Sequence, residues 1–597
     1  MFELNLHPSL FLLVGALLVL ILPVNLRFIG LIGGPLLSIV ASLSIPTDTV
    51  FSYHFLGLEL QVLKVDALSK VFGVIFSIMA FIAAVYALHV RNKGEHIAGL
   101  LYAASSLGVV FAGDWLTLFF CWEVMAAASV FLIWYRKTRK ALGAGFRYVL
   151  VHFIGGNILL AGVLLLALQG DITITPLSEV DGWAFWLILL GVGINAAIVP
   201  LHFWLTDAYP EGTITGSVFL CAFTTKVAVY VLTRVFPGTE LLIWLGVAMV
   251  LYGIVYAILE NDARRLLAYH IVSQVGYMVA AVGIGTELAL NGGVAHAYSH
   301  ILYKALLFMG AGAVIYATGK SKLTELGGLT KAIPLVAILY MIGGVSISGF
   351  PLFNGFISKS IIVYSASDMQ LVWILLHLVS VGTFLSTTLK LPYAKFIGGK
   401  NARVYKKSDL KKIPINMYVA MFIGAFLCIL YGIYPNLLYN MLPYPLEYEP
   451  YEPLKVIATI QLLTATAIAF WIYISKVGGE PKPKITLDIA DWLFRKPGAI
   501  CFNYLLSFIA GIKGVVDRGI DAFLKAIKPY LFNPCLIVIV PLCKVSSSYA
   551  SYFEQKGWIT KEIYCKFDED RYRTSIGASI LIATTILMFT AVAILII

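Results

Sequence analysis

The sequence HAYSHILYKALLFMGAGAV, residues 296–314, places two histidines and one lysine in a segment that is otherwise largely apolar. His296, His300 and Lys304 are spaced by four residues, so a helix would carry all three on one face. The surrounding apolar residues extend the segment to the roughly 20 residues that a bilayer-spanning helix requires. An ionisable residue at the centre of such a helix costs at least about 2.5–3.5 kcal/mol on insertion scales. The segment therefore predicts a spanning helix with a functional polar face.

The composition of the chain excludes a soluble protein. Apolar residues make up 60% of the 597 residues and charged residues 13%, whereas soluble domains have about 45–50% and about 25%. Disordered chains are poor in apolar residues, so disorder is excluded as well. The seven cysteines include no CxxC pair, and the sequence contains no phosphate-binding loop or nucleophile elbow. We expect no catalytic residue, no metal, no cofactor and no nucleic-acid partner.

Further apolar segments predict an all-α polytopic membrane protein with about 14–16 transmembrane helices. Lysine and arginine are enriched in alternate loops, which places the amino terminus outside and the basic loops in the cytoplasm of a cell (inner) membrane protein. The first apolar run lacks a basic leader, so we expect it to be a span. The candidate spans are approximately 8–25, 28–45, 67–90, 98–112, 115–135, 148–169, 183–206, 213–236, 241–260, 266–286, 293–317, 332–366, 370–392, 414–436, 455–477 and 575–597.

Two of these spans contain residues that interrupt a helix. Pro200 falls late in the 183–206 span, and Ser348-Gly349-Phe350-Pro351 interrupts the 332–366 span. Broken helices at membrane depth mark ion sites in transporters, although a kink that serves packing alone is the alternative. Lys390 follows Lys359 by 31 residues, as Lys226 follows Asn195. With the matched breaks, this interval predicts two inverted repeats, each containing a broken helix.

Ionisable residues near the centres of several spans favour a hydrated proton or ion path over structural ion pairs alone. A buried lysine releases its proton more readily than an exposed one, and a neighbouring glutamate stabilises the charged form. Histidine titrates near the operating pH and suits a relay. The candidate relay residues are Glu123, Lys226, His296, His300, Lys304, Lys359 and Lys390.

Four long motifs resemble the antiporter-like membrane subunits. This family includes the D subunit of Mrp-type Na⁺/H⁺ antiporters, the large membrane subunits of respiratory complex I and their relatives in membrane-bound hydrogenases. The resemblance covers about residues 65–435, and FLSTTLKLPYAKF (384–396) is most similar to the Mrp and hydrogenase branches. The motifs are VPLHFWLTDAY (199–209), RRLLAYHIVSQVGY (264–277), HAYSHILYKALLFMGAGAV (296–314) and SGFPLFNGFISK (348–359).

The resemblance implies roles for individual residues. Glu123 matches the glutamate of the family's fifth helix, and Lys226 matches the lysine of the eighth. His300 and Lys304 match the central relay, and Lys359 matches the lysine of the broken twelfth helix near the exit. The family implies proton translocation within a complex of several membrane subunits, with glutamate–lysine pairing as the switch.

The sequence departs from the family's pattern in the first half. Asn195 stands where the family usually carries a lysine, which leaves Glu123 without its expected partner. The family's PTPVSA segment is TITGSV (213–218) here, and Thr206 replaces the proline of WLPDA. Either the first half-channel works differently, for example through water at Asn195, or it no longer pumps.

Several polar residues carry both a functional and a structural interpretation. His202 and Asp207 either line a cytoplasmic entry path for protons or cap a helix end at the polar membrane interface. His270 either lines the same path or is a hydrogen-bonded histidine at the membrane interface. Lys390 matches Lys226 in the repeat or extends to the membrane surface. His152 is expected to be a packed polar residue.

The expected organisation has five parts. Apolar residues recur at three and four between about 503 and 528, which predicts an amphipathic helix that clamps neighbouring subunits or lies at the cytoplasmic face. The expected parts are amino-terminal helices over 1–66, an antiporter-like core over 67–436 with repeats at about 98–236 and 241–392, an additional span in 437–477, an amphipathic extension over 478–574 and a terminal anchor over 575–597.

Three functions remain open on the sequence. The first is a proton-translocating or Na⁺/H⁺ antiporting subunit of an Mrp-type complex. The second is a proton-pumping subunit of a redox complex, without a redox centre of its own. The third is a structural subunit with a decayed first half-channel, because of Asn195.

Overall fold

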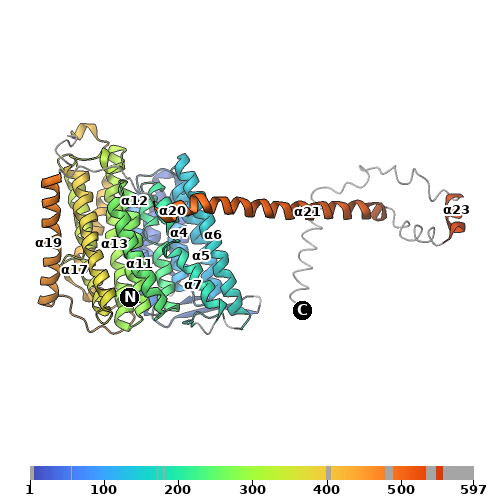
Figure 1. Ribbon diagram of the computed structural model, residues 1–597, viewed down its shortest axis with the longest axis horizontal. Coiled ribbons are helices and arrows are strands. Elements are labelled where there is room, and N and C mark those ends of the chain that lie inside the picture. Colours follow the sequence, from blue (N-terminus) through green and yellow to red (C-terminus); the bar gives the residue numbers. More distant parts are fainter. Residues whose placement is uncertain are drawn as a thin grey trace. The chain divides into compact units, whose positions relative to one another are not determined.

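The computed structural model describes residues 6–55, 57–170, 172–178, 182–398, 405–477, 488–532 and 546–555. Within these residues, 12 helices are long and apolar enough to cross a membrane. The helices of the first compact unit, Met1–Phe494, run nearly parallel to one another (Figure 1). The predicted all-α polytopic membrane fold is confirmed.

The spanning helices agree with the predicted spans, with ends displaced by up to about nine residues. The helices of the first half are α1 (Pro8–Ile21), α2 (Arg27–Ser44), α3 (Ala67–Ala87), α4 (Lys93–Phe111), α5 (Trp115–Trp134), α6 (Arg139–Ala167), α7 (Trp183–Asn195), α8 (Phe203–Ala208), α9 (Gly216–Leu220) and α10 (Thr224–Val235). The later helices are α11 (Glu240–Leu259), α12 (Ala263–Ile284), α13 (Glu287–Thr318), α14 (Pro334–Ile347), α15 (Asn354–Ser365), α16 (Gln370–Thr383), α17 (Ile415–Ile433), α18 (Asn436–Tyr439), α19 (Pro453–Val477) and α20 (Ile489–Leu493).

Side-chain caps fix the starts of several spanning helices. Asp66 forms a reciprocal capping box with Ser69 at the start of α3. Asp114, Asp262 and Thr286 accept hydrogen bonds from the first backbone N–H groups of α5, α12 and α13. Each cap satisfies donors that a helix leaves unpaired, which matters most where lipid replaces water.

A β-hairpin precedes α3 and was not predicted. Strands β1 (Val50–Phe55) and β2 (Leu58–Lys64) pair antiparallel, with an irregularity between Phe51 and Ser52. The segment is rich in β-branched and aromatic residues, which favour strands. Each strand is too short to register as a membrane span, so hydropathy over span-length windows does not reveal the hairpin.

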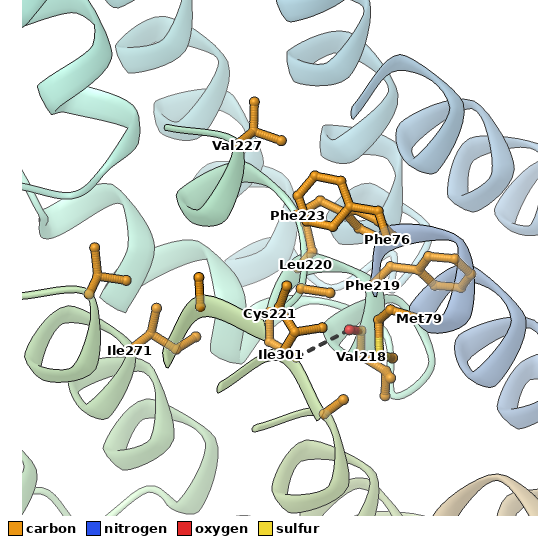
Figure 2. Close-up of a cluster of buried hydrophobic side chains, with 14 of the residues drawn as sticks. Phe76, Met79, Val218, Phe219, Leu220, Cys221, Phe223, Val227, Ile271 and Ile301 are labelled. Atoms are coloured by element: carbon orange, nitrogen blue, oxygen red, sulfur yellow. Dashed lines mark hydrogen bonds between the residues drawn. The ribbon is translucent and has the colours of Figure 1, made fainter. Parts of the chain in front are cut away.

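Both predicted helix breaks are present, and a third was not predicted. The chain leaves helical structure between α7 and α8 and between α14 and α15. The third break separates α9 from α10 at Cys221–Phe223, which contain neither glycine nor proline. Figure 2 shows this break packed among apolar side chains of α3, α12 and α13. The Tyr102 hydroxyl accepts a hydrogen bond from the Thr224 backbone N–H at 2.9 Å, which satisfies a donor freed at the break.

The helix after α16 is wound more loosely than an α-helix. Two π-helical segments, η5 (Phe384–Lys390) and η6 (Tyr393–Ile397), continue from it. Widened turns of this kind occur frequently at functional sites. They hold the Ser386 and Thr387 hydroxyls against α12.

The second compact unit, Arg495–Ile597, is described only in part. Its helix α21 (Ala499–Phe532) covers the amphipathic segment predicted at about 503–528, and α23 covers Ser547–Gln555. Within its own unit, α21 leaves apolar side chains such as Ile512, Val516 and Phe523 exposed. The expected terminal anchor at 575–597 lies outside the described residues.

Candidate functional site

Buried ionisable side chains from four helices form a row inside the first unit. They interact electrostatically from one to the next: Lys226 with Lys304, His300 with both lysines, and His270 with Lys304 and Lys359. No Asp or Glu among the described residues forms an ion pair with any member of this row. The row consists of Lys226 on α10, His270 on α12, His296, His300 and Lys304 on α13, and Lys359 on α15, each at most 5% exposed.

Lys226 lies two residues after the break that precedes α10. Its Nζ donates hydrogen bonds to the Cys221 backbone carbonyl at 2.6 Å and to Thr225 Oγ1 at 3.0 Å. Cys221 is the C-cap residue of the short helix α9, so its carbonyl carries the partial negative charge of a helix carboxyl end. The break thus supplies a backbone acceptor for the Lys226 ammonium.

Lys359 occupies the corresponding setting at the second predicted break. Its Nζ donates to the carbonyl of Ile347, the last residue of α14, at 3.2 Å. The ammonium also lies over the Tyr277 ring, 5.1 Å from its centroid, which favours a cation. Carbonyls at broken helix ends coordinate cations in transporters, and here they hold two lysines.

Lys390 differs from the other lysines in its position. Its Nζ donates to the carbonyls of Ile258 at 2.6 Å and Glu260 at 2.9 Å, at the carboxyl end of α11. The side chain is only half-buried. Lys390 therefore caps a helix end, and in the described residues no hydrogen bond joins it to the row.

Lys304 and His300 lie one turn apart on α13 and are fully buried. Lys304 Nζ and both ring nitrogens of His300 have no hydrogen-bond partner among the described residues. A buried ammonium without a partner is strongly unfavourable. The two groups therefore need water or the loss of a proton, as expected of a relay.

Histidines and hydroxyls extend the row on both sides. His296 Nδ1 lies 3.1 Å from Ser358 Oγ on α15, and its Nε2 lies 3.5 Å from the Tyr303 hydroxyl. His270 Nε2 lies 2.8 Å from Ser386 Oγ and 2.7 Å from Thr387 Oγ1 in the π-helical η5. A hydroxyl can both donate and accept, so these contacts can pass a proton in either direction.

Glu123 and Asn195 are separate from the lysine row. No ion pair joins Glu123 to a lysine in the described part of the chain, and its Oε1 has no hydrogen-bond partner there. Asn195, the last residue of α7, bonds through Oδ1 to His152 Nδ1 of α6 at 2.7 Å. His152 is packed, as expected from the sequence, but its pairing with the altered position was not predicted.

The altered segment 213–218 has a partner of its own. The hydroxyls of Thr213 and Thr215 both donate to Glu95 Oε1 on α4, the first at 2.6 Å. Arg264 Nη1 donates to the Gly212 carbonyl at 2.9 Å and to Ser217 Oγ at 3.0 Å. Hydrogen bonds from threonine hydroxyls hold this segment where the family uses prolines.

His202 and Asp207, two residues of the expected entry path, have partners. Asp207 Oδ2 forms an ion pair with Arg147 Nε at 2.7 Å. His202 is fully buried, and its Nε2 lies 3.6 Å from Asp488 Oδ2. Asp488 directly precedes α20 and also accepts hydrogen bonds from the hydroxyls of Tyr252 at 2.6 Å and Tyr269 at 2.5 Å.

Asp488 and Phe494 attach the segment that contains α20 to the core. Phe494 stacks on Phe203 with ring centroids 4.0 Å apart. Burial alone would raise the pKa of the Asp488 carboxyl, but the nearby His202 ring and the hydrogen bonds from the Tyr252 and Tyr269 hydroxyls outweigh it and hold the pKa well below its usual range. No local pattern in the sequence marks this contact, because Asp488 follows its partners by more than 200 residues.

We expect Asp488→Ala to release α20 from the core at pH 7. The change leaves two tyrosine hydroxyls without their acceptor, at about 1–3 kcal/mol for a buried unsatisfied group. Hydrogen exchange at 489–493 should quicken at least about tenfold, whereas the exposed Asp517→Ala should leave it unchanged. Because the folded pKa is depressed, the stabilisation is present above the unfolded value of about 3.9 and is lost only as pH falls below it. Protection that differs between pH 5 and pH 8 would contradict this assignment.

A cavity of about 500 Å³ lies beside Lys359. The break after α14, helices α15, α16 and α19 and the segment before α19 line it, with residues that include Ser348, His377 and Tyr448. At its rim Lys455 pairs with Glu452 at 2.9 Å. The basic-loop pattern predicts that Lys455 lies on the outer side, so we expect the cavity to lie between Lys359 and the outer face.

The fold and the row together define an antiporter-like membrane protein: a bundle of spanning helices, broken where lysines lie. The family described as NADH:quinone oxidoreductase/Mrp antiporter, transmembrane, matches residues 112–386. An uncharacterized protein of Methanocaldococcus jannaschii is 31% identical over 59% of this chain and 77% of its own length. The chain belongs to this family.

Characterised relatives come from different kinds of complex. The D subunit of the Na⁺/H⁺ antiporter of Alkalihalophilus pseudofirmus is 32% identical over 43% of this chain and 56% of its own length. The N subunit of the NADH-quinone oxidoreductase of Desulforudis audaxviator is 32% identical over 50% of this chain and 63% of its own length. The chain thus spans less than two thirds of each of these two relatives.

Solved structures share the fold. A chain of the Mrp complex from Dietzia superimposes with a TM-score of 0.64 at 23% identity, covering 78% of this chain and 98% of that one. A chain of the archaeal membrane-bound sulfane sulfur reductase gives a TM-score of 0.68 at 22% identity, over 91% of this chain and 100% of that one. At these identities the likeness to an Mrp complex and to an archaeal respiratory membrane complex shows the fold alone.

Proposed function

We propose that the chain is the proton-translocating subunit of a multi-subunit Mrp-type complex in the cell membrane. The observation that carries this proposal is the row of buried lysines and histidines, with Lys304 fully buried and without a hydrogen-bond partner in the described structure. A structural role would favour paired charges or apolar replacements. Similarity to the A and D subunits of Na⁺/H⁺ antiporters supports the Mrp-type assignment.

The chemistry of the row follows from its contacts. Lys226 and Lys359 each hold a proton against a backbone carbonyl at a helix break. When either lysine loses its proton, it loses the charge that made this bond strong. Protons pass between them through His300, Lys304 and the hydroxyl-linked histidines. His202, Asp207 and His270 lie on the proposed entry side, and the cavity beside Lys359 leads to the exit.

The test is proton movement in inside-out vesicles that contain the complete complex. Lys226→Ala should lower the initial rate of proton movement at least about tenfold, because it removes a buried group that can carry a proton. The substitution also removes the side-chain hydrogen bond that the Cys221 carbonyl accepts in the described structure. Lys322→Ala is the matched control, since Lys322 is exposed and its pair with Glu325 is worth about 0–1 kcal/mol. A wild-type rate in Lys226→Ala would support the alternative of a structural role.

A second function is favoured by the likeness to redox complexes. The sulfane sulfur reductase and a respiratory complex I share the fold, and hydrogenase-4 component B of Escherichia coli is 27% identical over 62% of this chain. In that setting the chain would pump protons without a redox centre of its own. Mass spectrometry of proteins that co-purify in mild detergent separates the two: small membrane subunits indicate an antiporter, and iron–sulfur or nickel subunits a redox pump.

A further inference from the structure

In the first half of the molecule, a hydrogen bond to Asn195 orients the imidazole ring of His152. His152 on α6 is 1% exposed, and its Nδ1 lies 2.7 Å from Asn195 Oδ1. An amide oxygen only accepts hydrogen bonds, so Nδ1 carries the proton and Nε2 is the basic nitrogen of the neutral ring. Nε2 has no hydrogen-bond partner in the described structure.

Glu123 approaches the same face of α6. A Cβ added at Gly156 would lie 2.0 Å from Glu123 Oε1, so the carboxyl group occupies the space that the glycine leaves. Gly156 follows His152 by four residues, and residues at this spacing lie one above the other, about 5–6 Å apart between Cβ positions. Glu123 Oε1, which comes from α5, therefore lies against α6 one turn after His152, and Glu123 Oε1 and His152 Nε2 are both buried without a hydrogen-bond partner in the described structure.

Two aromatic rings lie beside the imidazole of His152. The rings of Tyr148 and Trp204 lie 4.1 Å and 4.6 Å from the imidazole, centroid to centroid. Aromatic rings stabilise a neighbouring positive charge. The Tyr148 hydroxyl is hydrogen-bonded to Ser129, and Asp207 is paired with Arg147. Glu123, whose Oε1 has no hydrogen-bond partner in the described structure, is therefore the carboxyl group that we assign to the ring.

We propose that His152, oriented by Asn195, is the proton-carrying partner of Glu123, in the role that the family assigns to a lysine at position 195. The proton adds to Nε2 to give an imidazolium that the Glu123 carboxylate stabilises. It leaves from the same nitrogen, and no bond between heavy atoms forms or breaks. His152 on the neighbouring helix α6 thereby replaces the lysine that the family's pattern has at position 195. This assignment rests on the proposed proton translocation.

The experiment is a set of substitutions in the assembled complex, assayed as proton movement in inside-out vesicles. His152→Ala should lower the initial rate at least about tenfold. His152→Gln should be equally slow, because glutamine fills the space and can bond to Asn195 but holds no proton. The double variant His152→Ala/Asn195→Lys restores the family's lysine and should recover the rate to within about threefold of wild type.

The pH profile distinguishes proton transfer from packing. A lysine releases its proton at higher pH than a histidine, so the rate maximum of the double variant should lie at higher pH than that of the wild type. A wild-type rate in His152→Ala or His152→Gln would overturn the proposal, as would failure of Asn195→Lys to rescue an assembled His152→Ala complex.

Failure of this proposal can be distinguished from failure of the proposed function. Lys304→Ala serves as the reference, because Lys304 belongs to the central row and not to the His152 site. If Lys304→Ala stops transport while His152→Gln does not, only the role of His152 is refuted. If both variants transport at the wild-type rate, proton translocation by this chain is refuted.

Discussion

Replacing Lys304 with alanine should lower proton translocation at least about a hundredfold while leaving the folded protein intact or more stable. Lys304 is fully buried, and its Nζ has no hydrogen-bond partner in the described structure. It interacts electrostatically with Lys226, His270 and His300 and therefore joins the two halves of the row. Removing an unpaired buried cation relieves an unfavourable burial and offsets the cavity that alanine leaves, and thermal unfolding separates a loss of transport from a loss of folding.

Lys304→Arg is the sharper companion to this experiment. Arginine keeps the positive charge but does not release its proton in proteins, so it should stop transport as completely as alanine does. Both variants are compared by a fluorescent pH-gradient probe in vesicles and by thermal unfolding in detergent. Transport at more than half the wild-type rate in Lys304→Arg would show that Lys304 does not need to release a proton.

Gly355→Ala should prevent correct assembly of the second broken helix. A Cβ at this position would lie 1.8 Å from the Ser346 carbonyl oxygen, far inside any tolerable contact. The obstacle is backbone at the end of α14, which cannot move aside as a flexible side chain could. Overpacking of this kind costs about 1–3 kcal/mol or more. We expect a lower unfolding temperature and a lower yield of the assembled complex.

The same substitution should displace Lys359. Gly355 precedes Lys359 by one helical turn, and Lys359 bonds the carbonyl of Ile347, next to the obstructing Ser346. Any complex that assembles should therefore also transport protons more slowly. Gly33→Ala is the control, because nothing lies within 4 Å of its Cβ position in α2 and alanine favours a helix. An unfolding temperature unchanged by Gly355→Ala would contradict the observed packing of α15.

Those parts of the fold that depend on local pattern could be predicted from the sequence. The break at Pro200 follows from proline's missing N–H, and that at 348–351 follows from a glycine and a proline two residues apart. The break at Cys221–Phe223 has no such signal, because its freed groups are satisfied by Tyr102, about 120 residues earlier. The hairpin at 50–64 has no signal in hydropathy either, because its strands are shorter than a membrane span.

The parts of the candidate site that lie within one helix could likewise be predicted from the sequence. The spacing of His296, His300 and Lys304 predicts one face of α13 directly. The pairing of His152 with Asn195 and the docking of Asp488 were not predictable, because each joins segments that only the tertiary fold brings together. Lys390 caps the carbonyls at the end of α11 and also interacts electrostatically with His270 of the row, so both interpretations of this lysine stay predictions.

The absence of acidic partners along the described row has a consequence for how many protons it can hold. Two unit charges 4 Å apart repel by about 4 kcal/mol at an effective dielectric constant of 20. In the proposed function, a proton that enters at Lys226 would weaken the hold of Lys304 and His300 on theirs, and the interactions of His270 with Lys304 and Lys359 would carry this effect to the other end of the row. Such single-file occupancy would link proton uptake to release along the row through the repulsion between neighbouring charges.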